Sequence, residues 1–144
     1  MPEKHGVTGI IFDDSREERY FLLLHRVLNW KGWEFVKGGI DDTDATPKDA
    51  VLREILEETG LSDVSVVTML PEKFAWIAKG TKYIYFPFLL KGDMSSIIDI
   101  TQEVIEHDGY KWVPESEVEE MLTHADNKKI FRDAISLLDS MESK

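Results

Sequence analysis

Short, dense runs of apolar residues separated by polar turns fill the first part of the chain. The runs at 7–12 and 20–27 have the length and density of buried strands. A further apolar stretch at 33–36 predicts a short strand, and the aspartate-rich stretch 40–45 that follows a pair of glycines predicts a loop. The pattern therefore predicts a set of strands before the first helix.

A helix with clear signals at both ends follows this loop. Thr46 suits the N-cap position, Pro47 suits the first helical position, and Asp49 lies three residues after the cap. Gly60 suits the position directly after the last helical residue, where a left-handed backbone conformation is common. These signals predict a helix between Thr46 and Gly60.

The second half of the chain continues with strands and closes with helices. Pro87 lies inside one of the strand-like runs and indicates an edge strand or a bulge. The order of elements predicts a mixed, layered α/β (α+β) fold, formed by one domain over residues 1–144. The predicted strands are 64–70, 74–78, 83–90 and 110–113, and the predicted helices are 114–123 and 127–141.

Composition excludes several classes of function. The 144 residues include 17 basic and 28 acidic side chains, for a net charge of −11, which opposes non-specific binding of a long nucleic acid or of an anionic membrane surface. The absence of cysteine excludes thiolate metal sites and thiol catalysis. The first residues form no apolar signal segment, and no apolar run approaches the roughly 18 residues of a membrane span. We therefore expect a cytoplasmic protein.

Three carboxylates share one face of the predicted helix. At about 100° per residue, Glu54, Glu57 and Glu58 fall within an arc of about 100°. Val51 and Ile55 fall on a different arc that can face the core. Hard divalent cations such as Mg²⁺ or Mn²⁺ bind oxygen ligands and would relieve the repulsion among the three charges. The ordinary alternative is a solvated acidic face.

The segment around these glutamates resembles the Nudix box, G-x5-E-x7-R-E-U-x-E-E-x-G-U, in which U is a bulky aliphatic residue. Residues 39–61 read GIDDTDATPKDAVLREILEETGL and match eight of the nine fixed positions. The exception is Ala45, which stands where the family has its first glutamate, and Asp44 or Asp42 is a candidate substitute. The matching residues are Gly39, Arg53, Glu54, Ile55, Glu57, Glu58, Gly60 and Leu61.

The resemblance implies the Nudix fold, in which a mixed β-sheet lies between helices, and it implies a reaction and a metal site. Nudix hydrolases cleave a nucleoside diphosphate linked to another moiety and use one to three divalent cations. By this resemblance, Glu54, Glu57 and Glu58 are the metal ligands and the carbonyl oxygen of Gly38 is a further ligand. Mg²⁺ or Mn²⁺ is the expected cofactor, and a small nucleotide or polyphosphate is the expected partner.

Two more residues receive catalytic roles by the same resemblance. Arg53 is expected to orient a glutamate of the cluster through a charge-assisted hydrogen bond, the alternative being an ordinary helix ion pair. The general base lies either in the box or outside it. Glu106, directly before a predicted strand, is the candidate outside the box, and a solvated loop glutamate is its alternative.

The region after the box resembles that of asymmetric dinucleoside tetraphosphate hydrolases. Trp76 followed by Lys79, and the segment 106–112 with its Glu-His-x-x-Tyr-Lys-Trp pattern, carry this similarity. It implies that Trp76 stacks on a base, that Lys79 meets phosphate, and that Tyr83 contributes to the substrate site. Lys37, which directly precedes the glycine pair, is a further candidate to meet phosphate. The favoured substrate is diadenosine tetraphosphate, cleaved to ATP and AMP.

Departures from the subfamily and competing functions remain open. Gly32 and Val36 replace a histidine and a proline of the subfamily pattern, while Trp30 and Trp33 are further candidates for the site. ADP-ribose, nucleoside triphosphates, capped RNA ends and inositol pyrophosphates are alternative substrates. A non-catalytic nucleotide-binding domain and a scaffolding domain are alternatives of another class, and the retained box glutamates favour catalysis over both.

Overall fold

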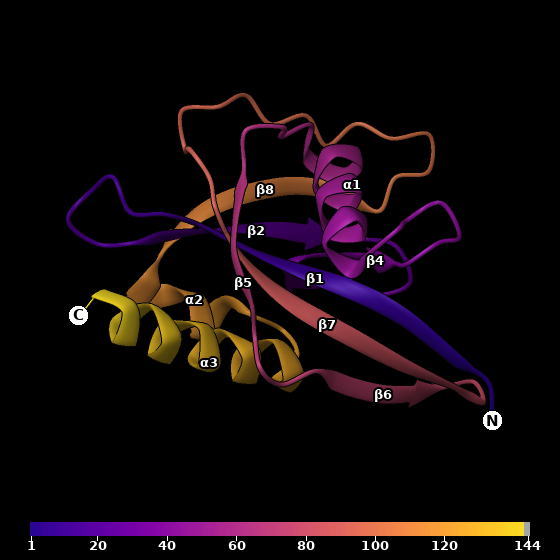
Figure 1. Cartoon of the computed structure of the whole chain (residues 1–144). Helices are drawn as coiled ribbons and strands as arrows, with labels where there is room; N and C mark the ends of the chain where they lie inside the picture. Colours follow the sequence, from indigo (N-terminus) through magenta and orange to yellow (C-terminus); the bar gives the residue numbers. More distant parts are fainter. Residues whose placement is uncertain (143–144) are drawn as a thin grey trace.

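A mixed β-sheet forms the centre of the computed structural model, which describes residues 1–142 (Figure 1). Within these residues the sheet has eight strands, whose central path is β3-β2-β1-β7-β5, while β4 pairs with β1, β6 with β7, and β8 with β2. The pairing of β1 with β7 is parallel and the others are antiparallel. The strands are β1 (Glu3–Asp13), β2 (Tyr20–Arg26), β3 (Gly32–Glu34), β4 (Val36–Gly39), β5 (Ser65–Met69), β6 (Phe74–Ala78), β7 (Thr81–Lys91) and β8 (His107–Pro114).

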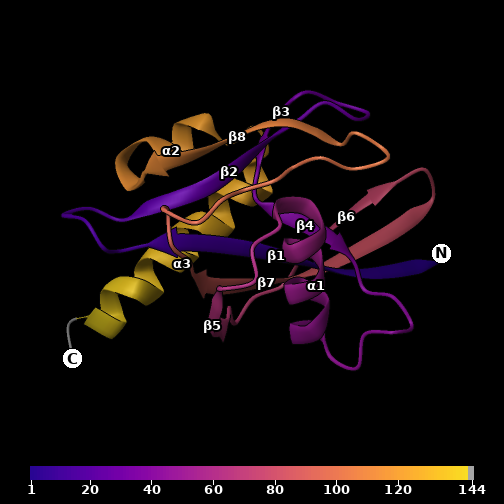
Figure 2. The same ribbon diagram turned by 90° about the horizontal axis from the view of Figure 1, so that it is seen from above.

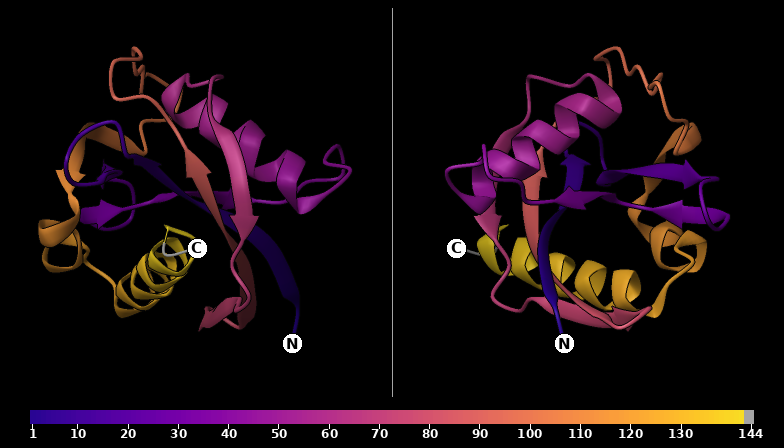
Figure 3. Two further views of the ribbon diagram at one scale, coloured as in Figure 1. Left: turned by 60° about the vertical axis from the view of Figure 1, so that its left-hand side comes forward. Right: turned by 90° about the vertical axis from the view of Figure 1, so that its right-hand side faces the viewer.

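Helices cover both faces of this sheet, as the side views show (Figure 3). Helix α1 (Pro47–Thr59) lies on one face, and α3 (Ala125–Glu142), preceded by the short α2 (Glu115–Met121), lies on the other. A hydrophobic core lies on each face of the sheet, and alternate residues of β1 point into one or the other. Ile11 packs with α1, and Ile10 packs with α3. The predicted fold class is therefore confirmed. No helix within residues 1–142 has the length and apolar content needed to span a membrane.

The ends of α1 follow the signals in the sequence. The Thr46 hydroxyl accepts a hydrogen bond from the backbone N–H of Asp49 (3.2 Å), and Pro47 occupies the first helical position. Gly60 ends the helix with φ of 75°, in the left-handed region that favours glycine. Val51 and Ile55 are fully buried against the sheet, as their arc predicts.

The structure corrects several predicted elements. The expectation of an edge position for Pro87 is wrong, because β7 lies between β1 on one side and β5 and β6 on the other. The alternative of a bulge at Pro87 is also wrong, because its pairing with Thr8 of β1 is regular and the irregularity in the pairing with β5 lies between Val66 and Thr68. Pro87 is tolerated there because it falls where the neighbour of β7 changes from β6 to β5, and its carbonyl accepts a hydrogen bond from Leu70 N–H (2.9 Å). The single predicted strand at 33–36 is two strands, and β1 begins earlier, at Glu3, because it pairs with β7 from Glu3 to Phe12.

Candidate active site

The end of β4 and the face of α1 meet in direct contact. Strand β4 pairs with β1, and α1 packs across the same strands (Figure 2). This arrangement brings Gly38 against Glu54. A Cβ atom at Gly38 would collide with the Glu54 carboxylate. Any side chain at this position would push the Glu54 carboxylate aside, whereas glycine lets the backbone of β4 lie within reach of any group that Glu54 binds.

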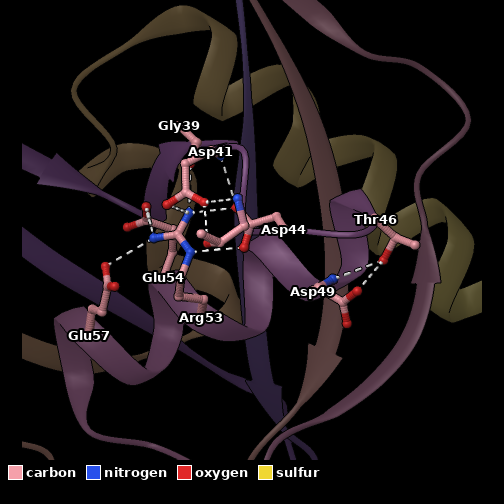
Figure 4. A network of polar contacts seen from close by, with 9 residues as sticks. Gly39, Asp41, Asp44, Thr46, Asp49, Arg53, Glu54 and Glu57 are labelled. Atoms are coloured by element: carbon pink, nitrogen blue, oxygen red, sulfur yellow. Dashed lines mark hydrogen bonds and ion pairs between the residues drawn. The ribbon is translucent and has the colours of Figure 1, made fainter.

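Arg53 organises the box from the solvent side of α1 (Figure 4). Its Nη1 donates to Glu54 Oε1 (3.0 Å) and to Glu57 Oε2 (3.1 Å). Its Nη2 donates to the Gly39 carbonyl oxygen (2.9 Å), which connects the helix to the end of β4. Asp44 completes the set by accepting from Nε (2.9 Å) and from Nη2 (2.8 Å). The guanidinium thus connects two glutamates of the box to the loop that precedes the helix.

Asp44 makes the contact expected of a substitute for the missing box glutamate at Ala45. Its side chain is only 4% exposed and holds Arg53 in a two-point interaction, the strongest geometry for an arginine–carboxylate pair. The hydrogen bond from Arg53 lowers the pKa of Asp44 to about 2, so the carboxylate is charged throughout the physiological range. Of the two candidate substitutes, Asp44 and Asp42, the structure joins Asp44 to Arg53.

Replacing Asp44 by Asn should lower kcat/KM by roughly tenfold or more, because partners that orient metal-site residues typically contribute 10- to 100-fold. The change removes the negative charge that holds Arg53 while it keeps the side chain's size. Steady-state kinetics on any substrate that the protein cleaves measures the effect. Asp42→Asn, two residues away in the same loop, is the matched control and should leave kcat/KM unchanged. Equal effects of the two changes would contradict the role given to Asp44.

Glu58 points away from Arg53 into the interior of the site. It is 2% exposed, and neither of its carboxylate oxygens has a hydrogen-bond partner among the described residues. Burial, reinforced by the charges of Glu54, Glu106 and Glu34, raises its pKa well above the ordinary value. A buried carboxylate without partners is costly unless it is protonated or meets a cation. The donor set of Glu54, Glu57 and Glu58 therefore fits a divalent metal ion bound through oxygen.

Glu54 is also a partly buried carboxylate with a raised pKa. Burial raises its pKa to about 7, with the charges of Glu57 and Glu106 adding to the rise and Arg53 opposing it. Glu57 differs from both because its side chain is 53% exposed and its carboxylate is paired with Arg53. The three glutamates therefore share one helix face but occupy three environments, which their spacing alone does not predict.

Glu106 reaches this cluster from outside the box. Its carbonyl oxygen accepts hydrogen bonds from the backbone N–H groups of Val27 (2.8 Å) and Leu28 (3.3 Å), which fix the chain just before β8. The next residue, His107, is buried, and its Nδ1 lies 3.8 Å from Glu58 Oε1. The structure thus brings together Glu106 and the box glutamate Glu58, as their candidate roles require.

Glu34 is a site residue that the sequence analysis missed. It is 1% exposed, and its Oε2 lies 2.7 Å from His107 Nε2 and 3.3 Å from Arg26 Nη1. Burial alone raises the pKa of Glu34, but the hydrogen bond from His107 and the charges of Lys37 and Arg26 outweigh it, so the pKa lies below the ordinary value. A charged residue inside the apolar run 33–36 was the available signal.

Metal should stabilise the fold more as pH rises through about 7. The folded-state pKa values of Glu54 and Glu58 are raised, so the folded protein holds more protons than the unfolded chain between pH 4.5 and about 7 and loses stability as pH rises through that window. A metal ion binds the deprotonated carboxylates and offsets this loss.

Melting curves recorded with and without Mn²⁺ across this pH range test the prediction. We expect the Tm difference between the two samples to widen with pH, because groups with lowered pKa values contribute equally to both samples. Glu54→Gln should flatten the dependence. A Tm difference that stays constant with pH would contradict the assignment.

An aromatic cavity of about 400 Å³ has in its wall Lys37 of β4, whose Nζ lies 3.6 Å from Glu34 Oε1. Trp30 and Trp76 form part of its walls, and the ring of His124 packs edge-on against Trp30 with 4.3 Å between ring centroids. The Lys37 ammonium lies 5.9 Å from the centre of the Trp30 ring and 5.3 Å from that of Trp76, a geometry for cation–π attraction. The cavity therefore offers flat aromatic surfaces, with Lys37 and Asp126 as its charged lining residues, and the aromatic walls suit a nucleobase.

The structure separates the remaining candidates for substrate binding. Trp76 is half-buried and stacks on Tyr83 (5.2 Å between ring centroids), so it is a wall residue and not part of the core. Tyr83 lines a neighbouring cavity of about 460 Å³ at the start of β1. Lys79 lies in the turn after β6 and is not among the described residues that line either cavity. Trp33 packs against the core below α3.

Comparison with known proteins identifies the family of this chain. Residues 3–134 match the NUDIX domain. The chain belongs to the NUDIX family. An RNA pyrophosphohydrolase of Sulfurovum sp. (strain NBC37-1) is 30% identical over 142 residues, covering 90% of this chain and 88% of the relative.

Other NUDIX proteins show the same relationship in sequence and in structure. An RNA pyrophosphohydrolase of Pseudomonas aeruginosa (strain LESB58) is 32% identical over 122 residues and covers 74% of each chain. The crystal structure of a C. elegans Ap4A hydrolase binary complex superposes with a TM-score of 0.82 at 19% identity, covering 95% of this chain and 98% of that one. At this identity the likeness shows the fold, and the family assignment makes the protein a hydrolase.

Proposed function

We propose that this NUDIX hydrolase cleaves a phosphoric anhydride bond in a nucleoside polyphosphate, with diadenosine tetraphosphate, split to ATP and AMP, as the favoured substrate. The observation that carries the proposal is the position of β4. Lys37 of this strand lines the aromatic cavity, and the next residue, Gly38, contacts Glu54 in the carboxylate cluster. A base held in the cavity would therefore place its phosphates beside the cluster.

Different residues of the chain have different roles in the proposed reaction. A divalent cation, when bound, neutralises the phosphates and activates the attacking water. Lys37 supplies a positive charge between the aromatic walls and the cluster, where a phosphate would enter. Arg53 holds Glu54 and Glu57 in place. The acceptor of the water proton is either a box glutamate or Glu106, whose side chain is 35% exposed at the edge of the cluster.

A second candidate substrate is the triphosphorylated 5′ end of an RNA. It is favoured by the curated relatives, which carry the name RNA pyrophosphohydrolase at 30–32% identity over most of the chain. The cavity suits the terminal nucleotide of either substrate. The net charge of −11 opposes extended contact with an RNA backbone and so favours the dinucleotide as substrate.

A panel of substrates tests the proposal directly. Diadenosine tetraphosphate, ADP-ribose, ATP and a short 5′-triphosphorylated RNA are incubated with Mg²⁺ or Mn²⁺, and products are separated by chromatography. We expect ATP and AMP from the dinucleotide at the highest kcat/KM, and no turnover in excess EDTA. A higher kcat/KM for the RNA would select the second candidate. A preference for ADP-ribose would contradict both candidates, and binding without hydrolysis would indicate a non-catalytic nucleotide-binding domain.

A further inference from the structure

Glu58, Glu106 and His107 bring three potential metal-ligand atoms together from two separate segments of the chain. One carboxylate oxygen of each glutamate and one ring nitrogen of the histidine lie within 4.8 Å of one another. We infer that these residues form a metal position in which the His107 Nδ1 atom is a ligand, and which prefers Mn²⁺ or a later first-row transition ion to Mg²⁺. The inference rests on the proposed metal-dependent function and adds a nitrogen ligand to an otherwise oxygen-based site.

The first support is the orphaned carboxylate at the centre of the group. Glu58 is 2% exposed, and both of its oxygens lack a hydrogen-bond partner among the described residues. Its nearest potential cation is the ring of His107, whose Nδ1 lies 3.8 Å from Oε1. That separation is too long for a hydrogen bond. Two ligands each about 2.1 Å from one ion lie roughly 3 to 4.2 Å apart, depending on the angle, so the observed spacing leaves room for a shared ion.

The second support is the partner of the other ring nitrogen. A carboxylate only accepts hydrogen bonds, so the contact between His107 Nε2 and Glu34 Oε2 (2.7 Å) places the hydrogen on Nε2. In the neutral ring this leaves a lone pair on Nδ1, which faces Glu58. Metal-binding histidines almost always donate their other N–H to a carboxylate, a carbonyl or a water in this way. Glu34 is itself fixed by Arg26 (3.3 Å) and faces Lys37 (3.6 Å).

The third support is access from solvent. The side chains of Glu58 and His107 are only 2% and 1% exposed, but that of Glu106 is 35% exposed. Glu106 is therefore the member of the group that solvent reaches. On the solvent side of the box, by contrast, Glu57 is paired with Arg53.

The ligand set predicts the choice of metal. Imidazole nitrogen is a good ligand for first-row transition ions, whereas Mg²⁺ prefers oxygen and retains its waters. The purely structural alternative is a protonated His107 that bridges Glu34 and Glu58 without any metal. That alternative predicts no contact between a bound ion and the ring.

Pulsed electron paramagnetic resonance of the full chain loaded with Mn²⁺ and labelled with 15N-histidine separates the two possibilities without substrate. At saturating Mn²⁺ we expect nitrogen-15 modulation from one directly bound imidazole. His107→Gln should abolish it, and His25→Gln, which removes a histidine that also contacts a carboxylate (Asp108, 2.6 Å), should leave it intact. Absence of the modulation, or its survival in His107→Gln, would overturn the inference.

The test remains decisive if His107→Gln does not fold. The chain has four histidines, so retention of the signal in the separate variants at His5, His25 and His124 would assign it to His107, and its loss in any of them would refute the assignment. In the wild type the ratio of Mn²⁺ to Mg²⁺ affinity should exceed that of a folded His107→Gln by about tenfold. Failure of the substrate panel with a positive nitrogen signal would reject the proposed function alone, and the reverse result would reject only the histidine ligand.

Discussion

Glu58→Gln should lower kcat by about 100-fold or more and, in the metal-free protein at alkaline pH, raise the Tm. The loss of activity follows from removing a buried ligand or base at the centre of the cluster. The gain in stability follows because the wild-type carboxylate is buried, unpartnered and close to other negative charges, so its ionisation is unfavourable in the fold. A gain of about 1–2 kcal/mol would raise the Tm by roughly 3–6 °C in a domain of this size.

Other glutamates of the chain provide controls for the predicted combination of lower kcat and higher Tm. Glu57→Gln should also lower kcat by about 100-fold if Glu57 binds metal, but its side chain is exposed and paired with Arg53, so the Tm should hardly change. Glu119→Gln and Glu120→Gln, on α2, should leave kcat unaltered. Steady-state kinetics and thermal melting in EDTA measure both effects. A Glu58→Gln variant that is less stable and fully active would show that Glu58 has a structural role only.

Trp76→Ala should lower kcat/KM for diadenosine tetraphosphate by about ten- to a hundredfold. Stacking of a base on an aromatic side chain contributes about 1–3 kcal/mol, which corresponds to this range. Trp76 is half-buried in the cavity wall and its ring lies 5.3 Å from Lys37 Nζ, so the change removes both a stacking surface and the cation's aromatic neighbour. Hydrolysis of a small pyrophosphate without a base should decline much less.

Ile77→Ala is the matched control for Trp76→Ala. Ile77 is the next residue of β6 and is 62% exposed, so its truncation should alter neither kinetics nor Tm. Comparison of kcat/KM across substrates in the two variants shows whether the nucleobase of the substrate stacks on Trp76. An equal loss on every substrate, accompanied by a fall in Tm, would mean that Trp76 supports the sheet and does not contact the nucleotide.

The parts of the fold that the sequence predicted well depend on local interactions. The cap at Thr46, the end at Gly60 and the buried arc of α1 each involve residues within a few positions of one another. The interior position of Pro87 depends on where two other strands end beside β7, and no local pattern encodes that arrangement.

The parts of the site that were missed depend on contacts between distant segments. Glu34 and His107 are 73 positions apart, and only the pairing of β2 with both β3 and β8 brings them together. The contact between Trp30 and His124 likewise joins the loop after β2 to the start of α3. Asp44 was one of two candidates, because a loop of several aspartates does not show which of them reaches Arg53.

The two halves of the site come from different layers and share only β4. The carboxylates belong to α1 and the start of β8, whereas the aromatic walls belong to β6, the loop after β2 and the start of α3. Substitutions at the rim, such as those at His124 or Asn127, can therefore reshape the preference for a leaving group without displacing the reacting centre. An insertion in β4 cannot change specificity in this way, because one extra residue would turn Lys37 to the opposite face of the sheet. New specificities in this scaffold should arise by exchange of rim side chains around a strand of constant length.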